Sequence, residues 1–225
     1  QPNSGAAGEY AGLRVIRANQ VREDKSDDSI KEVYAALRAG ESAQTAAVNP
    51  DRWLNAMEPH LAEGRDVLVM AFSSGLSTTY QSAVIAAEEL REKYPERTIY
   101  VVDTLCASRG EGLLVWYACK KRDEGMTLDE LHKWVEDTKL HLCHWFTVDD
   151  LMYLKRGGRI SAATALVGTM LKVKPVLHVD NEGHLINMFK VRGRKASLEA
   201  IANKLGELGC RKTDGIPVEQ KVVAM

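Results

Sequence analysis

The feature that most constrains this chain is an alternation of short apolar runs and stretches of about a dozen residues with helical periodicity. Two apolar runs of strand length, Val67–Phe72 and Thr98–Val102, flank a stretch whose apolar residues recur at helical spacing. A strand, a helix and a second strand in succession form a βαβ unit, in which the two strands lie parallel. We therefore predict an α/β fold whose N-terminal part is a mainly parallel sheet flanked by helices.

Local signals predict several element boundaries. Asn49-Pro50 is a cap followed by a first-turn proline and predicts a helix start, while Pro59 is predicted to kink or end that helix early. Thr127 and Glu130 have the spacing of a capping box and predict another helix start. The other elements predicted in this part are strands at Leu13–Ile16 and His141–Val148 and helices at 30–37, 80–90 and 110–121.

The pattern changes after about residue 150. Pro175–Val179 and His184–Phe189 are typical of two strands, and the turn residues 181–183 between them predict an antiparallel hairpin. A helix with apolar residues at 198, 201, 202 and 205 follows. We therefore predict two domains: an N-terminal α/β domain at 1–150 and a C-terminal α/β domain with the hairpin at 151–225. We expect native sequence beyond at least one end, so that the second domain is incomplete.

Charge and cysteine usage exclude several classes of protein. The chain has 225 residues and a net charge of −1, which excludes a histone-like or polyanionic protein. Its longest apolar runs fall well short of the roughly 18 residues that a membrane-spanning helix needs, so we expect no integral membrane insertion. The four cysteines are far apart and form no CxxC pair, which favours reduced thiols and a cytoplasmic location.

Motifs for common enzyme chemistry are incomplete. Gly110-Glu111-Gly112 lacks the third glycine of a dinucleotide fingerprint, and the stretch 72–76 lacks the flanking glycines of a hydrolase nucleophile elbow. His141, Cys143 and His144 could be metal ligands, but on a strand the two histidines would point to opposite faces. We therefore favour ordinary strand residues there, and predict no catalytic residue, no cofactor and no metal.

Five hydroxyl side chains and a glycine lie within the segment from Ser73 to Thr79, where a buried strand passes into a helix. The carboxyl end of a parallel strand is where α/β proteins bind ligands, and a helix N-terminus favours an anion. The same residues could simply cap the helix. Both interpretations stay open, and Thr45, just before the cap at Asn49, has the same two interpretations more weakly.

Positive charge is concentrated between Leu151 and Lys195, where nine Lys and Arg residues and two acids give a local charge of +7. Arg156 and Arg159 flank a Gly-Gly turn, an arrangement suited to gripping a carboxylate or a phosphate. The alternatives are a solvated basic face and a nucleic-acid-binding surface. Only Tyr153 and Phe189 are aromatic in this segment, which is poor for base stacking, so we expect no nucleic-acid partner.

Several motifs in order resemble those of the DegV family, bacterial cytoplasmic fatty-acid-binding proteins. The resemblance runs from about Thr45 to Leu205. It is carried by FSSGLSTTYQ at 72–81, Val102-Asp103, VDDLMYLKRGGRIS at 148–161, KPVL at 174–177 and KVRGRK at 190–195. The resemblance implies a two-domain fold that holds a long-chain fatty acid in a tunnel at the domain boundary. It also implies that the acyl carboxylate is presented to a fatty acid kinase, which makes acyl phosphate for phospholipid synthesis.

The resemblance also implies roles for individual residues. Thr45, Ser73 and Ser74 would hydrogen-bond the carboxylate, and Arg156 would lie near this head group. Arg159 would dock the kinase, with Arg192 and Arg194 of the same basic segment as further docking residues. Where the family usually has Thr-Ser, this chain has Thr45-Ala46.

We therefore expect a fatty-acid carrier that is not an enzyme. The rival from another class is a serine-dependent acyl hydrolase or transferase that uses Ser73 or Ser74 as its nucleophile. Such an enzyme needs a general base, and the sequence places neither His141 nor His144 near the serine turn.

Overall fold

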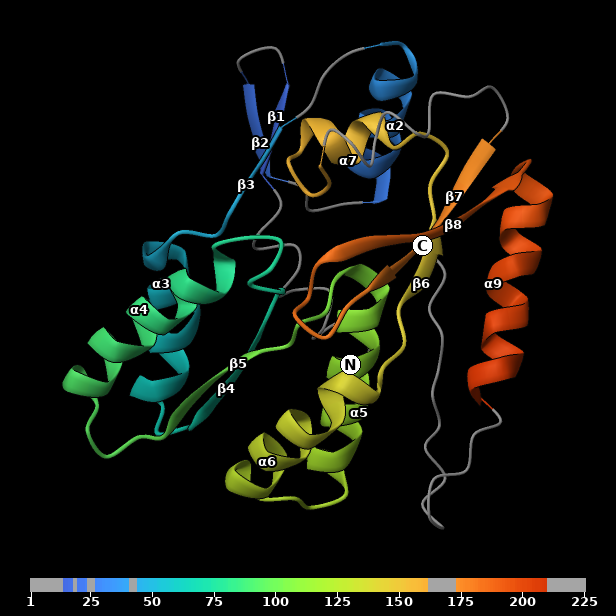
Figure 1. Ribbon diagram of the computed structural model, residues 1–225. Coiled ribbons are helices and arrows are strands. Elements are labelled where there is room, and N and C mark those ends of the chain that lie inside the picture. Colours follow the sequence, from blue (N-terminus) through green and yellow to red (C-terminus); the bar gives the residue numbers. More distant parts are fainter. Residues whose placement is uncertain (1–13, 18–19, 24–26, 41–43, 162–172, 210–225) are drawn as a thin grey trace. The chain divides into compact units, whose positions relative to one another are not determined.

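A computed structural model describes residues 14–17, 20–23, 27–40, 44–161 and 173–209 (Figure 1). The chain divides into two compact units, residues 1–102 and 103–225. The predicted α/β class is confirmed, because helices accompany both a parallel sheet and a three-stranded antiparallel sheet. These two units are defined by contacts within the chain and do not test the predicted domains. The domain boundary at residue 150 therefore stays a prediction.

The first unit contains a three-stranded antiparallel sheet and a two-stranded parallel sheet. Its described elements are β1 (Arg14–Arg17), β2 (Gln20–Glu23), α2 (Asp27–Arg38), β3 (Gln44–Ala46), α3 (Pro50–Ala62), β4 (Val67–Ala71), α4 (Thr79–Lys93) and β5 (Ile99–Asp103). The β1 strand lies between β2 and β3 and pairs antiparallel with both. The β4 and β5 strands form the parallel sheet, and α4 connects them as the βαβ pattern predicted (Figure 1).

The core of the first unit lies where α3 and α4 pack against each other and against β4. Three alanines of α4, Ala83, Ala86 and Ala87, are fully buried. Such small side chains let two helices approach closely, so that Met57 and Leu61 of α3 also become buried. This packing fixes the start of α4 relative to the end of β4.

The local signals around α3 are partly confirmed. The side chain of Asn49 accepts a hydrogen bond from the Arg52 N–H at 3.1 Å, and Pro50 is the first helical residue, as predicted. The prediction that the helix ends early at Pro59 is wrong, because α3 continues to Ala62. Pro59 has no N–H and so removes one hydrogen bond of the helix. Because Pro59 lies in the last turn of α3, this loss affects only the end of the helix.

The second unit joins a helical pair to an antiparallel sheet. Its described elements are α5 (Ser108–Asp123), α6 (Leu128–Thr138), the 3₁₀ helix η1 (Lys139–His141), β6 (Trp145–Thr147), α7 (Met152–Arg156), β7 (Val173–Val179), β8 (Leu185–Arg192) and α9 (Arg194–Gly209). The predicted capping box is present at Thr127 and Glu130, at the start of α6. The predicted hairpin is β7 and β8, and Gly183 in its turn has a φ of 78°.

The β6–β7–β8 sheet is covered on both faces. Because neighbouring strand residues point to opposite faces, Trp145 and Val176 pack with Ile201 of α9, while Phe146 and Leu177 join a separate cluster. That second cluster includes the chain around α7. The sheet therefore holds α9 and α7 on opposite sides.

The prediction of a strand over His141–Val148 is only partly right. Residues 139–141 form η1, and the strand is limited to Trp145–Thr147. This strand pairs antiparallel with β7 and does not extend the parallel sheet. The argument that His141 and His144 point to opposite faces of one strand is therefore wrong, since neither residue lies in a strand.

Candidate functional site

A hydroxyl-rich turn connects the carboxyl end of β4 to α4. Ser73 is fully buried, and its hydroxyl accepts a hydrogen bond from the Gly75 N–H at 3.2 Å. Its carbonyl accepts hydrogen bonds from the Leu76 and Ser77 N–H groups at 3.1 and 3.2 Å. Ser73 therefore shapes the turn, whereas Ser74, the next residue, is exposed.

The start of α4 is organised by two further hydroxyls. Ser77 Oγ accepts a hydrogen bond from the Thr79 N–H at 3.2 Å and lies 2.9 Å from Thr79 Oγ1. Thr79 Oγ1 also accepts a hydrogen bond from the Val48 N–H at 3.3 Å. Ser77 thus orders the turn that leads into α4, whereas Thr78, the N-cap residue, makes no side-chain capping hydrogen bond. The anion-binding role of the turn stays a prediction.

Thr45 lies in β3 opposite Val15 of β1, and its side chain is exposed. Val48 follows three residues later and is the residue bonded to Thr79 at the start of α4. Three extended residues span at most about 10 Å, so this contact holds Thr45 close to the same end of α4. Of the residues predicted to bind a carboxylate, Thr45, Ser73 and Ser74 thus belong to the first unit.

Arg156 and Arg159 belong to the second unit, at the end of α7 and in the turn that follows. The exposed Arg156 guanidinium lies over the Tyr153 ring, 5.6 Å from its centroid. The Arg159 guanidinium donates instead to the carbonyl of Gly157. Gly158 between them has a φ of 76°, a conformation that favours glycine. Their roles at a head group and in docking stay predictions.

Arg192 and Arg194 differ in their surroundings. Arg192 is exposed at the end of β8. Arg194 is the first residue of α9, and its guanidinium donates to the Thr147 carbonyl at 3.5 Å and lies 3.9 Å from the Asp149 carboxylate. The predicted docking role of both residues is untested.

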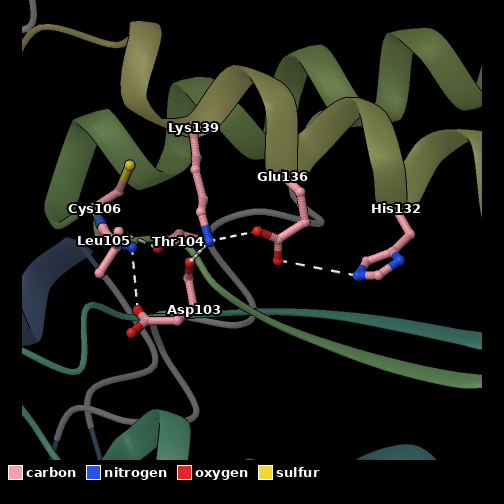
Figure 2. A network of polar contacts seen from close by, with 7 residues as sticks. All are labelled: Asp103, Thr104, Leu105, Cys106, His132, Glu136 and Lys139. Atoms are coloured by element: carbon pink, nitrogen blue, oxygen red, sulfur yellow. Dashed lines mark hydrogen bonds and ion pairs between the residues drawn. The ribbon is translucent and has the colours of Figure 1, made fainter. Parts of the chain in front are cut away.

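A polar network that the sequence pattern did not predict surrounds the turn after β5 (Figure 2). Lys139 Nζ donates to the Asp103 carbonyl at 2.9 Å and forms a 2.6 Å ion pair with Glu136. His132, one helical turn earlier on α6, lies 4.0 Å from Glu136. The Asp103 carboxylate accepts a hydrogen bond from the Leu105 N–H at 3.1 Å. Lys139 of η1 and Glu136 of α6 therefore fix the chain at Asp103, where the second unit begins.

The same turn has an unusual backbone. Leu105 and Ser108 have φ values of 53° and 52°, a region that non-glycine residues seldom adopt. Between them lies Cys106, whose N–H donates to Thr104 Oγ1 at 3.2 Å. Burial, together with the charge of Glu111, raises the pKa of the Cys106 thiol to about 12. Cys106 is therefore a neutral thiol and a poor nucleophile.

His144 is the most deeply buried histidine among the residues described, with 5% of its surface exposed. Its ring packs where a side chain on Gly110 of α5 would lie. Its carbonyl accepts hydrogen bonds from the Val179 N–H and from Nδ1 of His178. Burial, and to a smaller extent the nearby His178, lower the pKa of His144 to about 4, so the ring is neutral at pH 7.

A cavity of about 80 Å³ lies within the second unit, between η1 and the end of β7. Leu105, Lys139, His144, His178 and Asp180 are among its lining residues. Within the described part of the chain, no group of three or more His, Cys, Asp or Glu side chains could hold a metal ion. None of the described helices is both long and apolar enough to span a membrane.

Comparison with known sequences identifies a family model that matches residues 9–220, described as "Uncharacterised protein, DegV family". A DegV domain-containing protein of Clostridium perfringens is 45% identical over 198 residues, which cover 87% of this chain and 68% of that relative. The chain spans 60–68% of the length of the first three curated relatives.

Comparison with solved structures finds similar folds. A structure described as fatty acid binding of a DegV family protein from Thermus thermophilus has a TM-score of 0.79 at 28% identity, covering 95% of this chain and 83% of that one. The fatty acid kinase B3 protein of Streptococcus pneumoniae, loaded with linoleic acid, also has a TM-score of 0.79, at 25% identity. That match covers 88% of this chain and 70% of that protein.

Proposed function

The chain belongs to the DegV family, and on this premise we propose that it is a carrier that binds one long-chain fatty acid and presents its carboxylate to a fatty acid kinase. The observation that carries the proposal is the serine turn at the carboxyl end of β4, which leads into the N-terminus of α4. Solved relatives, one described as fatty acid binding and one as loaded with linoleic acid, support the choice of ligand.

The chemistry of this turn suits a carboxylate. The exposed Ser74 hydroxyl can donate a hydrogen bond, and the nearby positive end of the α4 dipole favours an anion. Thr45 is a second hydroxyl donor, held near the same helix end by the Val48–Thr79 contact. A fatty acid also contributes up to about 0.8 kcal/mol for each buried methylene, provided that its carboxylate is hydrogen-bonded.

We propose a carrier and not an enzyme, with a cytoplasmic location. A serine hydrolase needs a general base whose pKa lies near the working pH. His144, with a pKa of about 4 and a ring packed against Gly110, is a poor base at neutral pH. The kinase partner is proposed from the similarity to the fatty acid kinase B3 protein of Streptococcus pneumoniae.

Mass spectrometry of an organic extract of the purified chain tests the proposal. We expect one fatty acid per chain, because a ligand with a buried tail dissociates slowly. Protein that is free of lipid and does not take up added palmitate or oleate would contradict a carrier function. Incubation with an activated acyl ester, followed by intact-mass measurement, tests the rival function. Covalent acylation of Ser73 or Ser74 would support the hydrolase.

A further inference from the structure

The α7 helix carries Arg156 but is too short to fix its own orientation. It has five residues, and an isolated helix of this length is not stable in water. Leu151 before it and Ile160 after it are buried in the cluster beside the sheet, and Asp150 accepts a 2.8 Å hydrogen bond from the Met152 N–H. These contacts anchor both ends of the segment, but α7 exposes the guanidinium of Arg156 to solvent.

Two basic side chains converge on the residues immediately before α7. Lys174 of β7 donates from Nζ to the Asp149 carbonyl at 2.9 Å and lies 3.3 Å from the Asp149 carboxylate. Arg194, at the start of α9, lies 3.9 Å from the same carboxylate and donates to the Thr147 carbonyl at 3.5 Å. We call Lys174, Arg194 and Asp149 the Asp149 clamp.

The clamp connects β7, a strand of the sheet, and α9, which packs on the sheet, with the segment that leads into α7. Lys174 is only 21% exposed, so its charge is partly withdrawn from solvent and directed at Asp149. Lys174 and Arg194 reach the same carboxylate, and without it these two cations would repel each other. Asp149 precedes Asp150, the residue that bonds to the first N–H of α7, so a shift at Asp149 is passed directly to the helix.

We propose that Lys174 and Arg194 are positioning residues that set the orientation of α7 and, through it, of the Arg156 guanidinium. The inference rests on the proposed function in one respect, the role of Arg156 beside the fatty-acid carboxylate. It assigns Arg194 an intramolecular role where the sequence predicted kinase docking, and it gives Lys174 a role in ligand binding.

Ligand release from the purified chain tests this assignment. In Lys174→Met and Arg194→Met, oleate should dissociate roughly two- to fivefold faster, the range expected for a lost exposed ion pair. Release of oleyl alcohol, which has no charge for Arg156 to bind, should not change. Lys195→Met is the matched control, because Lys195 is 91% exposed, is adjacent to Arg194 and pairs with Glu199 of its own helix. It should release oleate at the wild-type rate.

Double variants distinguish positioning from an independent effect. If the clamp acts through Arg156, the Lys174→Met substitution should have little effect on oleate release once Arg156 is absent. The double variant Arg156→Ala/Lys174→Met should therefore release oleate no faster than Arg156→Ala alone. Multiplied effects in the double variant would overturn the proposal. So would an equal loss of acid and alcohol, or wild-type oleate release by both clamp variants.

Amide hydrogen exchange separates failure of this inference from failure of the proposed function. The amides of residues 152–160 should exchange faster in both clamp variants than in Lys195→Met, whether or not a fatty acid binds. If the wild-type chain binds neither palmitate nor oleate, the carrier function fails and the exchange experiment alone decides the role of the clamp. Unchanged exchange in this segment would overturn the positioning role.

Discussion

At the scale of single residues, the hydroxyl groups of the proposed carboxylate site differ in their structural roles. Ser73 is fully buried and its hydroxyl shapes the turn, whereas the adjacent Ser74 is exposed. Ser74→Ala should therefore weaken fatty-acid binding by roughly 1–3 kcal/mol, the cost of a hydrogen bond lost from a desolvated charged acceptor. Titration with palmitate and with the corresponding alcohol measures this effect.

The alcohol titration serves as the control, because an alcohol lacks the carboxylate and should bind Ser74→Ala almost as well as wild type. Thr45→Ala should behave in the same way. If either variant loses acid and alcohol equally, the substitution damages the fold and the residue has no specific role at the head group. Ser73→Ala should reduce stability as well, since Ser73 is buried within the turn.

At the scale of elements, α5 contains two glycines that differ in the space available for a side chain. A Cβ on Gly110 would overlap the His144 ring, whereas a Cβ on Gly112 would meet no described atom within 4 Å. Gly110→Ala should therefore lower the free energy of unfolding of the second unit by about 1–3 kcal/mol. Gly112→Ala should raise it by up to about 1 kcal/mol, because alanine favours a helix. Urea unfolding measures both, and a neutral Gly110→Ala would contradict the close packing of His144.

Local signals in the sequence predicted helices better than strands. The caps at Asn49-Pro50 and at Thr127–Glu130 involve residues within one helical turn. A few consecutive residues are therefore enough to predict where each helix begins. The strands β2 and β3 were not predicted, because three or four residues carry little periodicity. The β3 strand also pairs with β1, which lies about 30 residues earlier in the chain. The network at Asp103 was missed for a related reason. Lys139 is 36 residues away, and no residue type marks the positive φ of Leu105.

At the scale of the whole molecule, the sequence predicted two domains, and the family resemblance implied that residues of both bind one fatty acid. The predicted carboxylate-binding hydroxyls belong to the first unit, and the four predicted arginines belong to the second. Local sequence signals cannot show how such distant residues combine, because this depends on packing between segments far apart in the chain. The site residues therefore stay predictions that binding experiments must test.

At the same scale, the rate of association with the proposed kinase partner should depend on Arg159. This side chain is anchored on the Gly157 carbonyl within the basic segment, where a charge governs association rates more than affinity. Arg159→Ala should retain its fatty acid but associate more slowly with a fatty acid kinase, most clearly at low salt. Stopped-flow association at two salt concentrations measures this, with Lys195→Met as a variant of equal charge. Loss of lipid from Arg159→Ala would assign the residue to the ligand site.

The stability of the second unit should fall in mild acid because of His144. Its pKa is about 4 in the folded chain and about 6.5 when unfolded, so folding favours the neutral ring. The stabilisation is fully present above pH 6.5 and is lost as the pH falls toward 4. The free energy of unfolding should therefore drop by about 2 kcal/mol between pH 7 and pH 5 from this residue alone.

Urea unfolding in a Trp53→Phe background measures this drop, since Trp116, Trp134 and Trp145 all lie in the second unit. His144→Leu, which has no titrating ring, should lack this part of the pH dependence. If both proteins show the same fall, other groups cause it and the buried neutral state of His144 is wrong.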